Sequence, residues 1–263
     1  KASAVVRSIK AGLGTDQTGV AIERLISNTL EAQGHRPISR QKATQLPSVY
    51  DPEFIQADAD LSQIAVGLAS SRSGRLCFYG PPGTGKTAYG YWLAQQLELP
   101  ICVKRASDIM SMWVGGNEKN IANAFKEAES DGAILMLDEV DSFLQDRRGA
   151  QRGWEVTMVN EMLTQMESFS GIFIASTNLM TGLDQAALRR FDLKVQFDFL
   201  SPEQALGLLC RHCVDLGFDL PSEELKTLVT RLGHLTPGDF AAVLRQNRFR
   251  PITSCETFVS ALQ

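Results

Sequence analysis

The chain has 263 residues, of which 44% are hydrophobic and 21% are charged, and its formal net charge is −4 at pH 7. A chain of this length and composition can bury a substantial core and divide into two domains. The acidic balance gives no overall electrostatic footprint for nucleic acid, and without a long apolar run or a signal-peptide pattern we expect a soluble protein with no membrane partner.

The first 49 residues have the pattern of a helical extension and a linker. The chain begins with Lys1 rather than methionine, so we expect it to be a piece of a longer protein. Apolar residues recur at helical spacing over 18–33, and Gly34 follows as a stop signal. The polar stretch 36–47 is typical of a linker, and we expect the next domain to begin at residue 50.

The chain from 50 to 200 alternates between strand and helix patterns. Helical spacing is clear over 154–169 and in an earlier segment that Asn117 is expected to cap. This alternation predicts an α/β fold with a parallel sheet. The predicted strands are 75–79, 101–104, 133–137, 171–176 and 193–199.

The strand patterns stop after Leu200. Ser201 and Gln204 form a capping box with Pro202 at the first helical position, so a helix is expected to begin there. We therefore expect a small all-α domain over 201–263. Its predicted helices are 202–216, 222–232 and 237–248.

A phosphate-binding motif, GPPGTGKT at 80–87, lies between the first predicted strand and a helical segment. Its glycines allow successive backbone amides to point at phosphate oxygens, and the following helix adds its positive N-terminal end. We expect Lys86 to reach the β- and γ-phosphates of a nucleoside triphosphate, and Thr87 to hold Mg²⁺. The expected nucleotide contacts are Pro81, Pro82, Gly83, Thr84, Gly85, Lys86, Thr87 and Ala88.

A pair of acids follows the apolar run 133–137. Open parallel sheets bind ligands at the carboxyl ends of their strands, which is where Asp138 and Glu139 fall. We expect Asp138 to hold Mg²⁺ and Glu139 to be the general base that deprotonates water. An apolar strand that ends in acids is also common at any solvent edge, but the phosphate-binding motif favours the catalytic interpretation.

These motifs and two later segments resemble the AAA+ ATPases. IASTN at 174–178 and LDQAALRRFD at 183–192 are similar to the second region of homology of the AAA subgroup, whose members remodel proteins. The resemblance covers 50–248. It implies a P-loop NTPase fold in which a three-layer large domain with a parallel sheet, 50–200, precedes a small helical lid domain, 201–263.

The resemblance also implies an active site that two subunits share. Asn178 is similar to the sensor that orients the attacking water. Arg189 and Arg190 resemble arginine fingers, which reach into the next subunit and stabilise the charge of the departing γ-phosphoryl group. The two arginines are adjacent, as in the spastin and katanin type, and which one is the finger stays open. Fingers supplied by a neighbour imply a ring of identical subunits, expected to be a hexamer.

A short aromatic loop is the expected contact with a client. Met112, Trp113 and Val114 precede two glycines and resemble the pore loop of protein-threading members. In a ring, such side chains would grip an extended peptide. The alternative is that Trp113 packs against its own domain. The basic stretch 146–153 stands where such proteins carry a second pore loop.

Two segments depart from the pattern of the family. Glu167 stands where many members have the aspartate of an Asp-Gly-Phe segment that signals between subunits. TPGDF at 236–240 occupies the place of a Ser-Gly-Ala-Asp motif near the adenine, and we expect Gly238 to let the backbone approach the base. Asp239 stands where other AAA+ branches carry a sensor arginine, which favours the protein-remodelling subgroup.

The five cysteines are an odd number at scattered positions, which indicates reduced thiols and a cytoplasmic setting. Cys210 and Cys213 flank His212 with the spacing of a metal-binding pair. Without a second cysteine pair, we expect a structural role rather than a metal site.

The function that we expect is Mg²⁺-dependent ATP hydrolysis coupled to work on a protein or peptide client, with nucleic acid not expected as a partner. One alternative is a nucleic-acid-linked AAA+ switch of the clamp-loader or initiator type, which the acidic balance and Trp113 disfavour. A second alternative is a nucleotide-dependent scaffold, which we rank last because all the hydrolytic groups are present.

Overall fold

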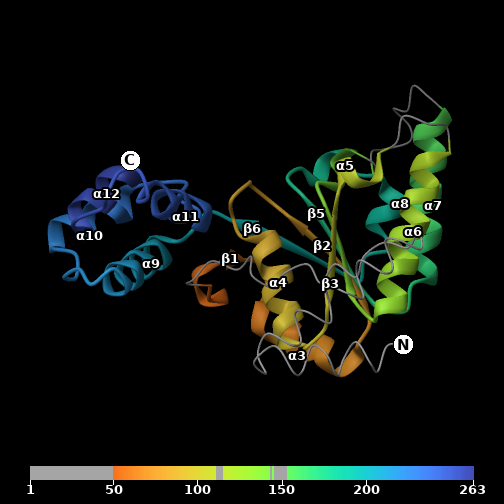
Figure 1. The fold of residues 1–263 in the computed structure, drawn as a ribbon, viewed down its shortest axis with the longest axis horizontal. Helices are drawn as coiled ribbons and strands as arrows, with labels where there is room; N and C mark the ends of the chain where they lie inside the picture. Colours follow the sequence, from red (N-terminus) through yellow and green to blue (C-terminus); the bar gives the residue numbers. More distant parts are fainter. Residues whose placement is uncertain (1–49, 111–114, 143, 145–152) are drawn as a thin grey trace, which may run out of the picture. The chain divides into compact units, whose positions relative to one another are not determined.

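A computed structural model describes residues 50–110, 115–142, 144 and 153–263 (Figure 1). These residues belong to one compact unit, Gln45–Gln263. Three predictions lie outside the described residues. They are the N-terminal helix and linker, the aromatic loop of Met112, Trp113 and Val114, and all of the basic stretch except Gly153.

The unit contains a six-stranded sheet in the order β1-β6-β2-β5-β4-β3. All neighbouring strands are parallel except β1 and β6, which pair antiparallel. This arrangement confirms the predicted α/β fold with a parallel sheet, to which the structure adds the short edge strand β1. The strands are β1 (Gln56–Ala57), β2 (Gly74–Tyr79), β3 (Ile101–Arg105), β4 (Ile134–Asp138), β5 (Ile172–Thr177) and β6 (Leu193–Asp198).

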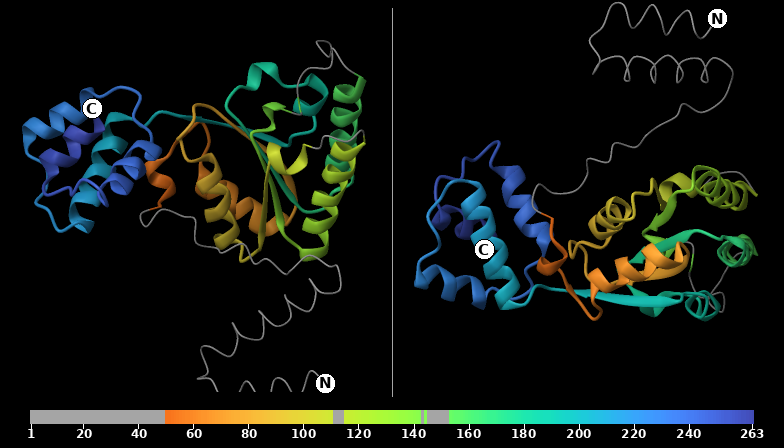
Figure 2. Two further views of the ribbon diagram at one scale, coloured as in Figure 1. Left: turned by 45° about the horizontal axis from the view of Figure 1, so that its top comes forward. Right: turned by 90° about the horizontal axis from the view of Figure 1, so that it is seen from below.

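Helices cover both faces of the sheet (Figure 1, Figure 2). Along β4, Ile134 and Met136 pack with one set of helices, whereas Leu135 and Leu137 pack with the other set. Successive side chains of a strand point to opposite faces, so a strand buried on both sides must be apolar throughout. The first set is α3 (Leu61–Ser71) and α4 (Lys86–Gln96), and the second is α6 (Gly116–Asp131) and α7 (Gly153–Ser168).

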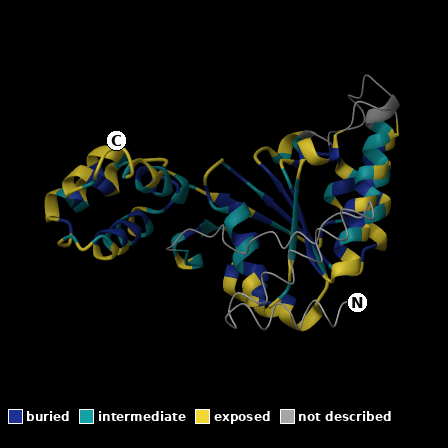
Figure 3. Ribbon diagram, in the orientation of Figure 1, coloured by how far each residue is buried: buried dark blue, intermediate teal, exposed yellow. Residues whose placement is uncertain are grey.

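The faces of these helices that point away from the sheet are largely exposed (Figure 3). On α6, Ile121, Phe125 and Ala128 are buried, as the helical spacing predicts. The prediction that Asn117 caps this helix is wrong. The N-cap is Gly115 at φ 77°, because the chain enters the helix in the left-handed conformation that glycine adopts without strain.

Several short elements lie before the first strand or between later strands. They are η1 (Pro52–Phe54), α5 (Ala106–Ile109), η2 (Val140–Ser142), η4 (Met180–Gly182) and α8 (Gln185–Leu188).

Helices alone follow β6. The capping box is present, since the amide of Gln204 donates to Ser201 Oγ at 3.2 Å and the amide of Ser201 donates to Gln204 Oε1 at 3.1 Å. These helices share a hydrophobic cluster of their own, centred on Phe240 and Phe258. The domain boundary at residue 201 stays a prediction. The helices are α9 (Pro202–Asp215), α10 (Glu223–Arg231), α11 (Pro237–Gln246) and α12 (Cys255–Leu262), of which α12 was not predicted.

Among the helices of the described residues, none combines the length and the apolar character that a bilayer crossing requires.

Candidate active site

The phosphate-binding motif forms the turn between β2 and α4. Three of its glycines have positive φ: Gly80 at 133°, Gly83 at 80° and Gly85 at 98°. Only glycine fits at position 80, because a Cβ there would lie 1.9 Å from the carbonyl oxygen of Phe197. Gly85 is the N-cap of α4 and carries no side chain, so no cap competes with an anion for the first amides of the helix.

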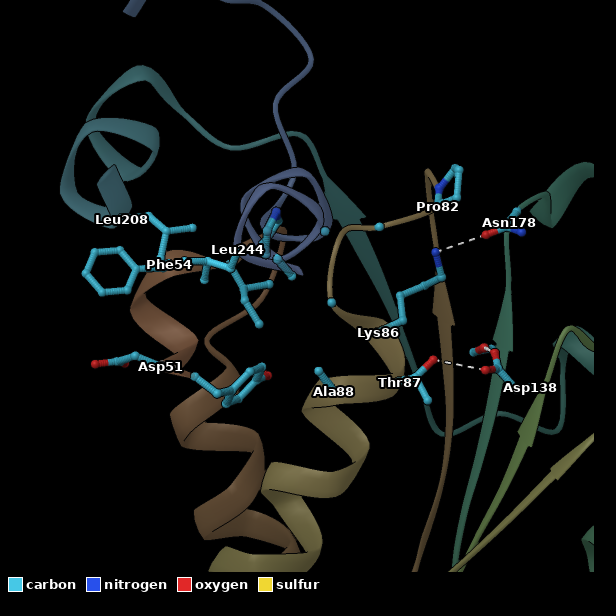
Figure 4. A pocket seen from close by; sticks show the side chains of 18 of the residues that line it. Asp51, Phe54, Pro82, Lys86, Thr87, Ala88, Asp138, Asn178, Leu208 and Leu244 are labelled. Atoms are coloured by element: carbon cyan, nitrogen blue, oxygen red, sulfur yellow. Dashed lines mark hydrogen bonds between the residues drawn. The ribbon is translucent and has the colours of Figure 1, made fainter. Parts of the chain in front are cut away.

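Lys86 joins this loop to the end of β5. Its Nζ donates to the carbonyl oxygens of Gly80 at 2.7 Å and Pro81 at 2.8 Å, and to Asn178 Oδ1 at 3.1 Å (Figure 4). Burial lowers the pKa of Lys86, and the nearby carboxylates of Asp138 and Asp141 act in the opposite direction. None of its three hydrogen-bond acceptors carries a full charge. An anionic phosphate fits this site, because it would supply a negative charge to pair with the buried ammonium group.

Thr87, the residue after Lys86 on α4, lies beside Asp138 at the end of β4. The hydroxyl of Thr87 donates to Asp138 Oδ2 at 3.0 Å. The other carboxylate oxygen accepts hydrogen bonds from the hydroxyl of buried Ser176 and from the amide of Glu139. Hydroxyl and carboxylate oxygens are the ligands that Mg²⁺ takes when it is shared between protein and phosphate. The oxygens of this corner therefore fit a magnesium ion.

Glu139 is an exposed residue with φ 59°. Positive φ is uncommon outside glycine, and such residues cluster at functional sites. Glu139 lines the same cavity as Asp138 and Thr87. A carboxylate at this position can accept a proton from water beside a bound phosphate.

Asn178 follows β5 directly, beside the end of β4. The two strands are parallel neighbours, with Leu135 opposite Phe173. Their carboxyl ends therefore meet at one edge of the sheet, as the sequence predicted. A hydrogen bond from the hydroxyl of Thr177 to Asp141 ties β5 to η2 just before Asn178.

A cavity of about 350 Å³ contains this edge and extends to segments that the sequence analysis did not assign to the site. Figure 4 shows Phe54, Leu208 and Leu244 on the opposite side of Ala88 from Asp138. These apolar side chains come from η1, α9 and α11, and a helical or turn pattern alone gave no signal that they would meet. The unpredicted lining residues are Tyr50, Asp51, Phe54, Ile55, Ser176, Thr177, Leu208, His212, Pro237, Ala241 and Leu244.

His212 is 5% exposed and stacks between two aromatic rings. Its ring centroid lies 5.9 Å from that of Phe240 and 5.9 Å from that of Phe258. Burial lowers the pKa of His212, opposed by the charge of Asp215. The imidazole is therefore neutral at pH 7, where it can accept one hydrogen bond and donate another.

Gly238 contacts the phosphate-binding loop directly. Its amide donates to the carbonyl oxygen of Gly83 at 2.9 Å. A Cβ at Gly238 would lie 2.9 Å from the Cα of Gly83, which is too close for any other residue. The N-terminus of α11 is fixed by Thr236 and Asp239, whose side chains hydrogen bond at 2.7 Å. Gly238 thus joins the cavity by allowing two backbones to touch.

The two arginines lie at the end of α8, and neither lines the cavity of its own chain. The Nε of Arg190 donates to Glu167 Oε1 at 2.7 Å, and its guanidinium also donates to the carbonyl oxygen of Ala186. Arg189 is exposed and makes no side-chain hydrogen bond or ion pair with another described residue. Of the residues predicted to contact nucleotide or metal, all except Pro81 and Thr84 line this cavity, whereas neither arginine does.

Comparison with known proteins identifies the family. Residues 76–199 match the model of the ATPase family associated with various cellular activities (AAA). The matched segment includes the phosphate-binding loop, both acids, Asn178 and the two arginines. This chain contains an AAA domain. The resemblance inferred from the motifs is thereby confirmed.

Several curated proteins are similar to this chain. Fidgetin-like protein 1 of Caenorhabditis elegans is 29% identical over 70% of this chain and 31% of its own length. Vacuolar protein sorting-associated protein 4 of Dictyostelium discoideum is 25% identical over 69% of this chain and 42% of its own length. Spastin of Drosophila erecta is 28% identical over 72% of this chain and 26% of its own length. The chain thus spans less than half the length of these relatives.

Proposed function

We propose that this AAA domain binds ATP with Mg²⁺, hydrolyses it, and uses the reaction to remodel a protein client. The observation that carries the proposal is the convergence of Lys86, Thr87, Asp138, Glu139 and Asn178 at the adjacent ends of β2, β4 and β5. These side chains are what phosphoryl transfer needs: a cation, metal ligands, a base and a group that positions water. The family match and the relatives support the same function and do not favour a nucleic-acid switch.

The chain's own residues account for binding the triphosphate. Lys86 and the amides of the loop and of the first turn of α4 would hold its phosphate oxygens. Thr87 and Asp138 would hold Mg²⁺, which when bound neutralises charge on the phosphates. Asp138 is oriented for this by the hydroxyl of Ser176. The apolar side chains of Phe54, Leu208 and Leu244, together with neutral His212, suit a purine base and its ribose.

Hydrolysis would follow by attack of water in line with the γ-phosphate. Asn178 would align the water through its side-chain amide, and Glu139 would accept the proton as the bond between oxygen and phosphorus forms. The bond from phosphorus to the bridging oxygen breaks, and ADP leaves with its new charge beside Lys86. Each of these groups already lies within or beside the same cavity.

The site would be completed by a second copy of the chain. Arg189 is exposed, has no partner among the described residues and lies outside its own cavity, so it is the arginine that is available to a neighbour. Arg190 is held by Glu167 and would instead keep α8 in position. A finger supplied in this way implies a ring, and we propose a hexamer in the cytoplasm. The loop of Met112, Trp113 and Val114 would contact the client.

A concentration series of phosphate release tests the proposal. Turnover per subunit should rise with protein concentration as rings form, and chelation of Mg²⁺ with EDTA should abolish it. A protein that binds ATP but releases no phosphate at any concentration would be a scaffold, and that result would contradict the proposal. Trp113→Ala should spare ATPase activity and abolish action on a client captured with the Glu139→Gln form.

A further inference from the structure

Three of the five cysteines lie in the C-terminal helices, and none of them has a role in the proposed reaction. Cys210 and Cys213 are on α9, and Cys255 is the first residue of α12. In the sequence, the cysteine nearest to Cys213 is Cys210. In the fold, Cys213 instead meets Cys255, which is 42 residues away, with the two Sγ atoms 2.8 Å apart.

The position of this pair is fixed by its surroundings. Cys213 is 0% exposed and Cys255 is 5% exposed, and both belong to the hydrophobic cluster of Phe240 and Phe258. The start of α12 is held by a capping box in which the amide of Thr257 donates to the hydroxyl of Ser254 at 3.3 Å. A disulfide has a bond of about 2.05 Å, so the sulfurs would need to approach by less than about 1 Å.

We propose that Cys213 and Cys255 are a disulfide-forming pair, which an oxidising disulfide such as oxidised glutathione converts into a covalent link between α9 and α12. One cysteine, as its thiolate, attacks a sulfur of oxidised glutathione, whose disulfide breaks and releases one reduced glutathione. The second cysteine loses its proton and attacks the mixed disulfide, which forms the protein disulfide and releases a second glutathione. The protein loses two electrons, and the glutathione disulfide gains them.

The environment makes this reaction slow at neutral pH. Burial raises the pKa of Cys213 to about 12, and it raises the pKa of Cys255 as well. Cys210 and Glu256 also raise both pKa values, whereas the hydrogen bond that Cys213 donates favours the thiolate of Cys255. The thiolate is the reacting form, so the rate of linkage should increase as the pH rises. A brief exposure to oxidant would leave the dithiol, and a persistent one would link it.

The link would affect the helix that carries part of the nucleotide cavity. Leu208 and His212 line the cavity from α9, and His212 directly precedes Cys213. His212 also stacks on Phe258 of α12, so the disulfide would join the two helices across a contact that already exists. Closing a loop of this length removes conformational freedom mainly from the unfolded chain. We therefore expect the melting temperature to rise by roughly 5–10 °C.

Oxidation of the complete chain under native conditions tests the pair. The protein is incubated with oxidised glutathione at pH 8, denatured, treated with N-ethylmaleimide and analysed by peptide mass spectrometry. We expect the number of free thiols to fall from five to three and a linked peptide to contain Cys213 and Cys255. Five remaining thiols, or a link between Cys210 and Cys213, would overturn the proposal.

Variants supply the control and a second measurement. Cys255→Ala should lose both the link and the rise in melting temperature, whereas Cys77→Ala, which removes a buried cysteine from the sheet, should keep both. Reductant should return the oxidised wild-type protein to its original melting temperature. A link that forms in wild type without any change in melting temperature would show that the disulfide does not constrain the two helices. That result would contradict the proposed effect of the link between α9 and α12.

Discussion

The ammonium group of Lys86 is surrounded by two backbone carbonyls and the amide oxygen of Asn178, all of which are neutral. A buried charge is stable only when it is fully paired, and the neighbouring carboxylates of Asp138 and Asp141 do not contact it directly. A bound triphosphate would supply the missing negative charge. The site thus already contains the cation with which an anionic ligand would pair.

Lys86→Met should weaken ATP binding by about ten- to a hundredfold, since a hydrogen bond to a charged group contributes about 1.5–3 kcal/mol. The measurement is titration of the nucleotide by calorimetry. Lys104 is the matched control, because it is also partly buried but pairs with Glu127 at 2.8 Å outside the cavity. Equal losses of affinity in Lys86→Met and Lys104→Met would contradict the role of Lys86.

Glu139→Gln should lower kcat by about 10²–10⁴-fold and leave ATP affinity within a few-fold of wild type, because the change removes a base and keeps the shape of the side chain. Single-turnover hydrolysis and calorimetry measure the two quantities. Glu129→Gln, at an exposed position on α6, should leave both unchanged. A Glu139→Gln protein with wild-type turnover would exclude Glu139 as the base.

His212 makes folding sensitive to pH. Its lowered pKa means that the unfolded chain binds a proton before the folded chain does, as the pH falls below about 6.5. The contribution of His212 to stability is therefore complete above that pH and is lost below it, with a slope of at most about 1.4 kcal/mol per pH unit. Urea unfolding of wild type and His212→Phe between pH 5 and 8 should show the two proteins diverging only at the acid end. Parallel curves would mean that His212 titrates normally.

Two contacts between elements position the site. Glu167 on α7 binds Arg190 at the end of α8, and the amide of Gly238 at the start of α11 binds the carbonyl oxygen of Gly83. The first contact fixes the segment that presents Arg189. The second joins the helices after β6 to the phosphate-binding loop.

Gly238→Ala should disturb the second contact, because the new methyl group would lie 2.9 Å from the Cα of Gly83. Overpacking of this kind costs about 1–3 kcal/mol, which should appear as a lower free energy of unfolding and as weaker ATP binding. Gly233→Ala is the control, since a Cβ at that position meets no atom within 4 Å. If both variants bind ATP like wild type, the contact has no part in the site.

The sequence predicted those parts of the site that are local. The loop of 80–87 and the acids after β4 are short motifs whose residues act within a few positions of one another, and the parallel sheet brings their ends together. The apolar half of the cavity was missed because Phe54 and Leu208 are distant in sequence. They meet through long-range contacts, such as that from Gln204 Nε2 to the carbonyl oxygen of Ile55 at 3.1 Å. The side-chain environment that separates Arg189 from Arg190 was equally invisible in a dipeptide of identical residues.

The cavity of one chain contains Lys86 and the residues proposed as metal ligands, base and sensor, but neither arginine. Arg189 lies at the end of α8 and is exposed. A subunit by itself would therefore be a poor ATPase, and a ring would be active at each contact between subunits. If the site is divided in this way, as we propose, assembly would be a condition of turnover.

Mixing two inactive variants tests this division most directly. Arg189→Ala keeps its own base but cannot supply a finger, whereas Glu139→Gln can supply a finger but has no base. We predict that each protein alone hydrolyses ATP at no more than about a hundredth of the wild-type rate at saturating nucleotide, and that the mixture recovers more turnover than either variant alone. Wild-type turnover of Arg189→Ala by itself would contradict the account.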